Sequence, residues 1–348
     1  MGEQRIGLTE LAAATAASLP GDELYRVEDL KVHFPLAQGL FAGLGGAKRR
    51  YVHALDGVSF SLGRGEILAL VGESGCGKTT TGRTLLRLEE ATGGAAFYRG
   101  LALQAFSERA LREYRKHAQI IFQDPYNSIN PKQTIADIVA EPLIVGGLSG
   151  GQAAREAKVI AALEDAGLRP ARDYLYRYPH ELSGGQRQRV CIAGAIVLDP
   201  DMIVADEPVA SLDVSIRNDI LKLMVAHKES RGVSYLFITH DLSLAWVISD
   251  RIAVMYLGKI VEIGETEEVV ANPAHPYTKA LISVIPVPDP TRKRARTILA
   301  GETPNPIDIA SGCRFHPRCP EAIAACKEQE PLDVDLGGGH MAACIRLR

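Results

Sequence analysis

The residues best suited to chemistry lie in one short glycine-rich segment, Gly72-Glu73-Ser74-Gly75-Cys76-Gly77-Lys78-Thr79. It matches the pattern G-x-x-x-x-G-K-[ST], in which backbone N–H groups, a lysine and a helix start surround phosphate oxygens. The apolar run Ile67–Val71 predicts a strand before it, and Thr80–Leu88 predicts a helix after it. The spacing therefore predicts nucleotide binding, with Thr79 on Mg²⁺ and Thr80 beside it. The simpler alternative is a glycine turn before a helix.

Two adjacent carboxylates, Asp206 and Glu207, follow a second apolar run at Met202–Ala205. Ligands of open α/β sheets bind at the carboxyl ends of the strands, so this pair is expected near the phosphates. We expect Asp206 to act on Mg²⁺ and Glu207 to polarise the water that attacks the γ-phosphate. The alternative is a strand that ends in a solvated acidic turn.

A second glycine turn stands before an apolar helical stretch, at Leu182-Ser183-Gly184-Gly185-Gln186. A glycine turn at a helix start again suits contact with an anion. A single nucleotide does not need two such sites from the same core. The second site is therefore expected to serve a nucleotide held by another subunit. The alternative is a simple helix cap.

These segments are distributed over alternating strands and helices, which predict an α/β core with a mostly parallel sheet. Ala118–Phe122 reads as a short strand that ends at Gln123. A helical insertion follows from Asp124 to about Tyr178, and includes Gln152–Ala166. The strand pattern returns at Met202–Ala205 and at Ser234–Thr239.

Composition describes an ordinary soluble globular protein. The 348 residues suggest about two domains, and 46% hydrophobic residues, 23% charged residues and a net charge of −3 give no support for a general nucleic-acid binder. No apolar run reaches the roughly eighteen residues that cross a bilayer. The apolar segment Leu11–Leu19 is short and predicts a loose helix rather than an export signal. The chain is expected in the cytosol, with any membrane role through a partner.

Taken together, the motifs from Leu24 to Gly264 resemble the ATP-binding-cassette (ABC) ATPase family. The resemblance implies a P-loop NTPase (RecA-like) α/β core with an antiparallel β subdomain, a helical subdomain and a C-terminal cysteine-rich extension. It implies three parts: an N-terminal extension at 1–23, an ATPase domain at 24–265 with the helical subdomain at about 124–186, and a C-terminal extension at 266–348.

The same resemblance implies roles for single residues. Gln123 links Mg²⁺ and the attacking water to the membrane partner, and Leu182–Gln186 closes on the opposite subunit's ATP. His240 senses the γ-phosphate. Asp213 ends the loop Ala210-Ser211-Leu212-Asp213, which crosses the dimer interface and reads Ser-Ala-Leu-Asp in many relatives. An aromatic ring stacks on adenine; Phe34 and Tyr51 are both candidates, and Phe34 is preferred because it ends the first strand.

The tail holds four of the six cysteines, Cys313, Cys319, Cys326 and Cys344. Cytosolic thiols stay reduced, so their crowding suggests a metal or cluster site, either a [4Fe–4S] cluster or zinc. His316 and His340 are substitute ligands if one cysteine is not used. The other two cysteines, Cys76 and Cys191, are expected to be packing residues.

The stretches Asn272–Thr278 and Cys313–Pro320 resemble the C-terminal extension of dipeptide/oligopeptide-permease ATPase subunits. In that subfamily the four cysteines are associated with an iron–sulfur cluster. The resemblance therefore implies a structural [4Fe–4S] cluster on all four, with zinc and free thiols as the alternatives.

The function implied is the ATP-hydrolysing subunit of a dipeptide or oligopeptide importer at the cytoplasmic face of the inner membrane. Its implied partners are a second ATPase subunit, two membrane-spanning permease subunits and an extracytoplasmic substrate-binding protein. A heterodimer of ATPases is expected, with a homodimer second. The alternatives are an importer of another cargo, such as nickel, glutathione or a sugar derivative, and a soluble ABC ATPase of DNA repair or the ribosome.

Overall fold

The computed structural model describes residues 5–16, 23–36, 49–148, 150–285 and 296–347. The chain forms two compact units, each built from several segments of the sequence. The first unit comprises residues 1–25, 62–67 and 98–238, and the second comprises residues 26–61, 68–97 and 239–348. Both units are discontinuous, and residue 265 lies within the second.

In the first unit, three parallel strands form the sheet, in the order β8-β7-β6. The middle strand, β7, is buried at every residue, as an apolar run covered on both faces should be. Among the described residues, the named helices and strands of this unit are α1 (Leu8–Ala16), β5 (Leu101–Ala102), α3 (Glu108–His117), β6 (Ala118–Ile121), α4 (Pro125–Ser128), α5 (Ile135–Val145), α6 (Gln152–Asp165), α7 (Gly184–Ile196), β7 (Met202–Asp206), α8 (Val214–Arg231) and β8 (Ser234–Thr239).

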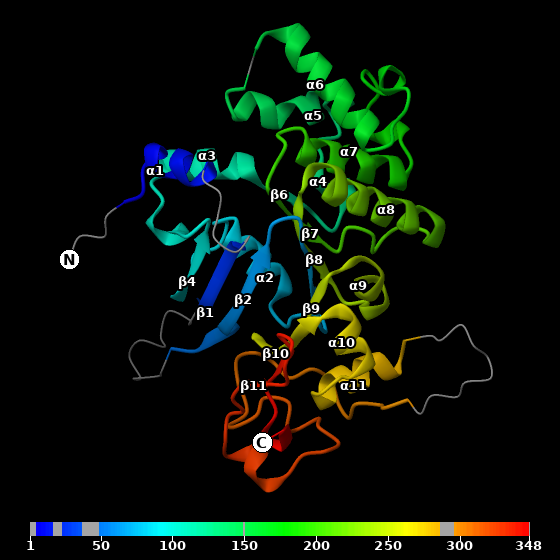
Figure 1. Ribbon diagram of the computed structural model, residues 1–348. Helices are drawn as coiled ribbons and strands as arrows, with labels where there is room; N and C mark the ends of the chain where they lie inside the picture. Colours follow the sequence, from blue (N-terminus) through cyan, green and yellow to red (C-terminus); the bar gives the residue numbers. More distant parts are fainter. Residues whose placement is uncertain (1–4, 17–22, 37–48, 149, 286–295, 348) are drawn as a thin grey trace, which may run out of the picture. The chain divides into compact units, whose positions relative to one another are not determined.

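The helical insertion predicted after Gln123 is present as α5 and α6, which pack on each other and on α7 (Figure 1). Helix α5 begins with a capping box, in which the Thr134 side chain accepts from the Asp137 N–H and the Asp137 carboxylate accepts from the Thr134 N–H. Helix α1 packs against α3 and contains most of the segment predicted as a loose helix, whose last residues lie outside the described part of the chain.

In the second unit, five strands are ordered β11-β12-β10-β9-β3, with β9 parallel to β3 and the outer neighbours antiparallel. A separate sheet places β1 between β2 and β4. The described elements of this unit are β1 (Glu23–Pro35), β2 (Tyr51–Gly63), β3 (Ile67–Val71), α2 (Lys78–Leu85), β4 (Gly93–Tyr98), α9 (Leu242–Ile248), β9 (Arg251–Tyr256), β10 (Lys259–Glu265), α10 (Thr266–Ala271), α11 (Pro276–Ser283), β11 (Val334–Asp335) and β12 (Met341–Ala342), together with short 3₁₀ turns at Ala324–Lys327 and Ile345–Leu347.

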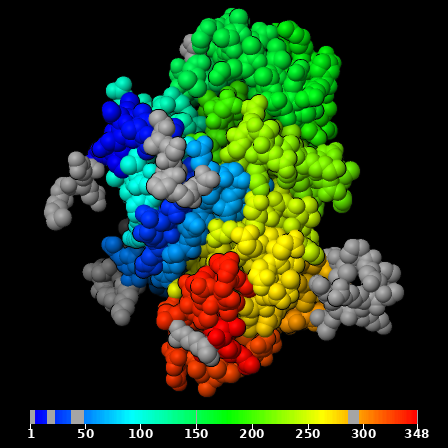
Figure 2. Space-filling view, in the orientation of Figure 1, coloured from blue at the N-terminus to red at the C-terminus, as the bar shows by residue number. Residues whose placement is uncertain are grey.

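An aromatic cluster attaches the C-terminal extension (266–348) to the sheet of this unit. The ring centroids of Tyr256 on β9, Tyr277 on α11 and Phe315 lie 4.9 to 5.3 Å apart, and all three side chains are buried. Figure 2 shows the later part of the extension, orange to red, as a surface continuous with its yellow first part, which contains α10 and α11. The extension is therefore packed into the second unit.

No helix within the described residues is both long and apolar enough to cross a bilayer.

Candidate functional site

The glycine-rich segment forms the loop between β3 and α2, as its pattern predicts. Gly75 and Gly77 have φ values of +78° and +109°, which side chains rarely allow. A Cβ on Gly72 would lie 2.3 Å from the Met255 carbonyl oxygen, and one on Gly77 would lie 2.4 Å from that of Ala54. The glycines are therefore required both by backbone conformation and by close packing.

Lys78 is the first residue of α2, and its ammonium lies across the loop. The side chain is buried, and Nζ donates to the carbonyl oxygens of Gly72 at 2.7 Å and Glu73 at 3.0 Å. Thr79 and Thr80 stand in the first turn of the same helix, and Thr79 is exposed. A positive side chain and a helix N-terminus thus meet at one loop, which is the arrangement that binds phosphate.

Glu73, the second residue of the loop, is held by the C-terminal extension. Its carboxylate makes a two-pronged ion pair with Arg318, at 2.7 and 3.1 Å, and accepts from the Thr303 hydroxyl. Its N–H donates to the Tyr277 hydroxyl at 3.0 Å. Burial alone would raise the pKa of Glu73, but the hydrogen bonds from Arg318 and Thr303 outweigh it and lower the pKa.

The two carboxylates predicted as a pair stand at the end of β7 in the first unit. Asp206 is the last strand residue and is buried, while Glu207 is half-buried. The Glu207 backbone has a φ of +46°, in the left-handed region, and its N–H donates to the Ile238 carbonyl of β8 at 2.9 Å. Such a conformation at a non-glycine residue is uncommon and is often found at functional sites.

Gln123 lies two residues beyond β6, because the strand ends at Ile121 rather than at Phe122. Its side-chain amide donates to Oε2 of Glu207 at 3.0 Å. The structure therefore brings together two of the residues that the sequence assigned to hydrolysis. They come from neighbouring parallel strands, whose carboxyl ends lie at the same edge of the sheet.

The segment Leu182–Gln186 opens α7, but its glycines are not a turn. Gly184 and Gly185 are already helical, and Ser183 is the N-cap. Ser183 Oγ accepts from the Gln186 N–H at 3.3 Å, and Gln186 Oε1 accepts from the Ser183 N–H at 3.0 Å, so the pair forms a capping box. A Cβ on Gly185 would lie 2.6 Å from Cγ2 of Ile216 on α8. Close approach to α8, and not a positive φ, requires that glycine.

The remaining predicted site residues lie at the ends of helices and strands. Ala210, Ser211 and Asp213 are exposed before α8, for which Asp213 is the N-cap residue. His240 is exposed and directly follows β8. The phosphate loop and His240 belong to the second unit, whereas Gln123, Leu182–Gln186, Asp206 and Glu207 belong to the first.

Phe34 and Tyr51, the two candidates for adenine stacking, stand at the same end of neighbouring strands. Phe34 is close to the end of β1 and 37% exposed, and Tyr51 begins β2 and is partly exposed. The Leu36 N–H donates to the Arg50 carbonyl at 3.0 Å, which joins the two strands there. Both rings remain available for this role.

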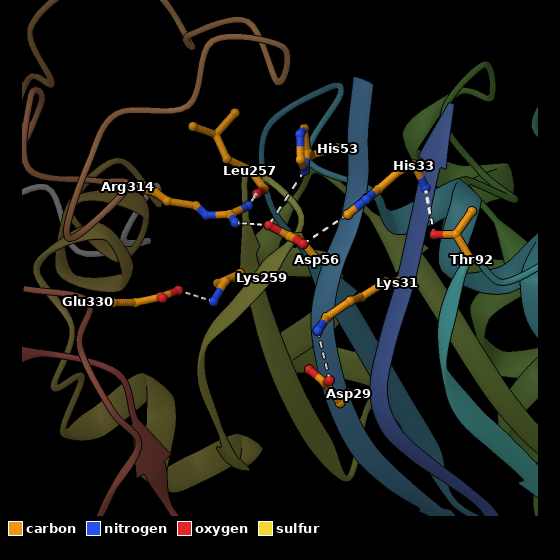
Figure 3. Close-up of polar contacts among 10 residues, drawn as sticks. All are labelled: Asp29, Lys31, His33, His53, Asp56, Thr92, Leu257, Lys259, Arg314 and Glu330. Atoms are coloured by element: carbon orange, nitrogen blue, oxygen red, sulfur yellow. Dashed lines mark hydrogen bonds and ion pairs between the residues drawn. The ribbon is translucent and has the colours of Figure 1, made fainter. Parts of the chain in front are cut away.

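Beside Phe34, a polar cluster joins β1 and β2 to the C-terminal extension (Figure 3). His33 Nε2 lies 2.9 Å from Asp56 Oδ1, His53 Nδ1 lies 3.7 Å from Asp56 Oδ2, and Arg314 pairs with the same carboxylate. Within the described residues, His33, His53 and Asp56 form the one group with three possible ligand atoms within 4.8 Å of one another. Since a guanidinium already neutralises this carboxylate, the cluster is an ion-pair network. Sequence reasoning did not identify any of its members.

In the first unit, a groove lies beside Gln123. Its volume is about 420 Å³, and Phe122, Asn130, Gln133 and Glu141 are among its lining residues. Phe122, which lines the groove, is 40% exposed, and Tyr126 on α4, the helix that contains the lining residue Ser128, is 57% exposed. An exposed apolar rim around a groove is typical of a protein-binding surface.

The four tail cysteines are free thiols, and their sulfur atoms do not form a group of three within 4.8 Å. Cys326 and Cys344 are buried, and the Cys313 N–H donates to the Cys326 carbonyl at 2.9 Å. Burial raises the pKa of Cys319 to about 11 and also raises the pKa of Cys313 and Cys344. Of the substitute ligands, His316 Nδ1 lies 2.9 Å from the Cys313 carbonyl oxygen, and His340 is paired with the buried Glu262 at 2.8 Å.

Two family models match this chain. Residues 55–210 match the ABC transporter model, and residues 261–326 match the model of the oligopeptide/dipeptide transporter C-terminal region. The first match contains the phosphate loop and the carboxylate pair, and the second contains Cys313, Cys319 and Cys326.

The chain is also similar along most of its length to curated transport proteins. It is 48% identical to the dipeptide transport ATP-binding protein DppF of Haemophilus influenzae, over 91% of this chain and 95% of that protein. It is 46% identical to the oligopeptide transport ATP-binding protein AppF of Bacillus subtilis, over 93% and 97%. The DppF protein of Escherichia coli is 44% identical, over 92% and 94%.

Solved structures confirm the predicted P-loop ATPase fold. The ATP-binding cassette MJ0796, described as a dimer in a post-hydrolysis state with ADP and Pi, matches with a TM-score of 0.60 and 25% identity, over 70% of this chain and 99% of its own. The cbiO1 protein of Clostridium perfringens, part of the ABC transporter complex cbiONQ, matches with a TM-score of 0.60 and 26% identity, over 72% and 92%.

The prediction of an iron–sulfur cluster on Cys313, Cys319, Cys326 and Cys344 is wrong. The relatives are named as ABC transport ATP-binding proteins, with no cluster, and neither they nor the family models support a [4Fe–4S] group or zinc. The structure agrees with this correction, since no three of these sulfur atoms lie within 4.8 Å of one another. The four cysteines are close in the sequence because they pack within a small tail. A buried cysteine acts there as a small apolar residue.

The motifs, the fold and the similarity over nearly the whole length agree with one another. The chain belongs to the dipeptide/oligopeptide family of ABC transporter ATP-binding proteins.

Proposed function

We propose that this chain is the ATP-hydrolysing subunit that powers import of dipeptides or oligopeptides through an ABC permease. The observation that carries the proposal is the similarity to dipeptide and oligopeptide transport ATP-binding proteins over more than nine-tenths of the chain, including the C-terminal region. The alternative of a soluble ATPase in DNA repair or on the ribosome has no such support.

The phosphate loop binds the triphosphate in this proposal. The backbone N–H groups of Gly72–Thr79 and the start of α2 face the phosphates, and Lys78 exchanges its two carbonyl partners for phosphate oxygens. Thr79, Asp206 and Gln123 would hold Mg²⁺, which would supply positive charge to the phosphates. Phe34 or Tyr51 stacks on the adenine.

Hydrolysis is assigned to the first unit's carboxylate. Glu207 orients and polarises the attacking water, and Gln123, which already donates to that carboxylate, places it. His240 contacts the γ-phosphate. The strained backbone at Glu207 supports this assignment, because strain at a non-glycine residue is retained where function requires a fixed side-chain direction.

A second ATPase subunit completes each site. Ser183, Gly184, Gly185 and Gln186 at the start of α7, together with the exposed loop that ends at Asp213, face the nucleotide of the partner. The dimeric state named for the MJ0796 cassette supports this assembly. A triphosphate held from both sides favours the closed dimer, and its hydrolysis removes that link. We propose a heterodimer, with a homodimer second.

The membrane partner is placed at the groove beside Gln123. Its apolar rim and its position next to the hydrolytic pair suit a permease segment that must transmit closure of the ATPase dimer. The full transporter then contains two permease subunits and an extracytoplasmic substrate-binding protein, and this chain is peripheral at the cytoplasmic face of the inner membrane.

The test is transport by the assembled complex. Proteoliposomes that contain the chain with its permease partners, the second ATPase subunit and the binding protein should take up labelled dipeptides or oligopeptides only with ATP on the ATPase side. Nickel, glutathione and sugar derivatives serve as competing cargos. Uptake of one of these without uptake of peptide would overturn the cargo assignment and leave the ATPase assignment in place.

A further inference from the structure

The C-terminal extension reaches into the phosphate loop through Arg318, Thr303 and Tyr277. We propose that the extension is a working part of the nucleotide site, in which Arg318 and Tyr277 are positioning residues that hold the loop in the shape needed for a triphosphate. The inference rests on the proposed role of Gly72–Thr79 in binding ATP. It assigns the extension a task in the ATPase reaction itself.

Every polar group of Glu73 has a partner, and three of the five partners belong to the extension. The N–H donates to Tyr277, and the carboxylate accepts from Arg318 and Thr303. The carbonyl accepts from Lys78 and from the Cys76 N–H. The Arg318 side chain is only 8% exposed, and both prongs of its guanidinium are used. A planar two-pronged pair fixes orientation as well as distance.

The contacts from the extension matter most when nucleotide is bound. The Glu73 carbonyl accepts from the Lys78 ammonium at 3.0 Å and from the Cys76 N–H at 3.4 Å, and the ammonium is the group that must turn to the phosphates. Once it does so, the Glu73 carbonyl keeps only the longer contact with the Cys76 N–H, and the other contacts of Glu73 come from the extension. Tyr277 and Arg318 then keep the part of the loop around Glu73 in place. The N–H groups of the loop therefore stay directed at the phosphate oxygens.

A second arginine of the extension, Arg314, is connected to the loop indirectly. Arg314 donates to the Leu257 carbonyl and pairs with Asp56 (Figure 3). The next residue, Gly258, accepts from the Asp56 N–H and donates its own N–H to the carbonyl of Cys76 at 2.9 Å. The loop is thus connected to the extension at Glu73 and, through one intervening turn, at Cys76.

The experiment compares Glu73→Gln, Arg318→Gln and the double variant in the assembled transporter. We expect Arg318→Gln to raise the KM for ATP by about tenfold and to leave kcat within about twofold, because the loop binds ground state and transition state alike. The double variant should be no worse than the worse single variant, since both remove one interaction. Arg318→Lys should recover part of the affinity, because it restores charge without the fork.

Arg346→Gln is the matched control, because Arg346 also lies in the extension and pairs with an exposed carboxylate, Glu321, away from the loop. It should leave KM unchanged. Unfolding temperatures separate a local effect on the loop from general loss of the fold. If Arg318→Gln proves unstable, Glu73→Gln tests the same ion pair from the other side, because it preserves the shape of the side chain. An unchanged KM in folded Arg318→Gln and Glu73→Gln, or strictly additive effects, would overturn the proposal. Normal ATP binding by Lys78→Ala would instead mean that the proposed nucleotide site is wrong.

Discussion

The side-chain amide of Gln123 donates to the carboxylate of Glu207 at 3.0 Å. The two residues are 84 positions apart in the sequence and follow neighbouring parallel strands. Phe122, the residue before Gln123, lines the groove proposed for the permease, so the proposed hydrolytic carboxylate and that groove are adjacent along the chain.

Glu207→Gln should abolish turnover and retain ATP binding. The amide keeps the shape of the side chain but cannot polarise water as a carboxylate does, and loss of such a group costs about 10²- to 10⁴-fold in rate. Phosphate release and nucleotide affinity measured on the same preparation check this. Glu229→Gln, an exposed change on α8, is the control and should behave as the unchanged protein. Turnover at the normal rate in Glu207→Gln would remove this residue from the mechanism.

Lys78→Ala should weaken ATP binding by at least about tenfold, because it deletes the full positive charge that faces the phosphates. Fluorescent-nucleotide titration measures the affinity, and circular dichroism confirms the fold. Lys327→Ala, an exposed change in the C-terminal extension, is the matched control for loss of a lysine. Equal affinities of Lys78→Ala and Lys327→Ala would contradict the site.

Gly77→Ala should destabilise the fold. The residue has a φ of +109°, and the new Cβ would lie 2.4 Å from the Ala54 carbonyl oxygen, so strain of about 1–3 kcal/mol is expected. Gly194→Ala is the opposite case, because it lies within α7 with no atom within 4 Å of the new Cβ, and should stabilise by about 0.5–1 kcal/mol. Denaturant unfolding measures both. The same sign for the two changes would count against the loop geometry.

His275→Asn should make the protein less sensitive to mild acid. The buried His275 ring is the N-cap of α11, where Nδ1 accepts from the Tyr277 N–H at 3.1 Å. Burial, aided by Lys279, lowers the pKa of His275 from 6.5 to about 3. Below 6.5 the unfolded chain takes up a proton that the folded chain refuses, so stability falls as pH drops towards the lower value.

Between about pH 7 and about pH 5 this single group should cost the unchanged protein about 2 kcal/mol of unfolding free energy. Asparagine also caps helices well but does not titrate, so the variant should lack that part of the loss. Unfolding curves at the two pH values give the difference. Equal losses in the two proteins would show that His275 is already protonated or not buried.

The sequence by itself determined the order and the local form of the ATPase motifs. The strand Ile67–Val71, the glycine loop and the helix that follows depend on contacts between near neighbours and on glycine conformations, which a short pattern specifies. For these elements the residue pattern was enough, and the similarity to ABC transporter proteins agrees with it.

Only the tertiary structure decided what joins the C-terminal extension to the nucleotide site. Glu73 and Arg318 are 245 residues apart, and Asp56 and Arg314 are 258 apart, so no spacing in the sequence predicts either pair. The tail cysteines are the opposite case. They lie close together in the sequence, which suggested a set of metal ligands, but the folded chain does not form such a set. Side chains meet according to the path of the backbone through the sheet, and pairs distant in sequence are set by packing of the whole unit rather than by local preference.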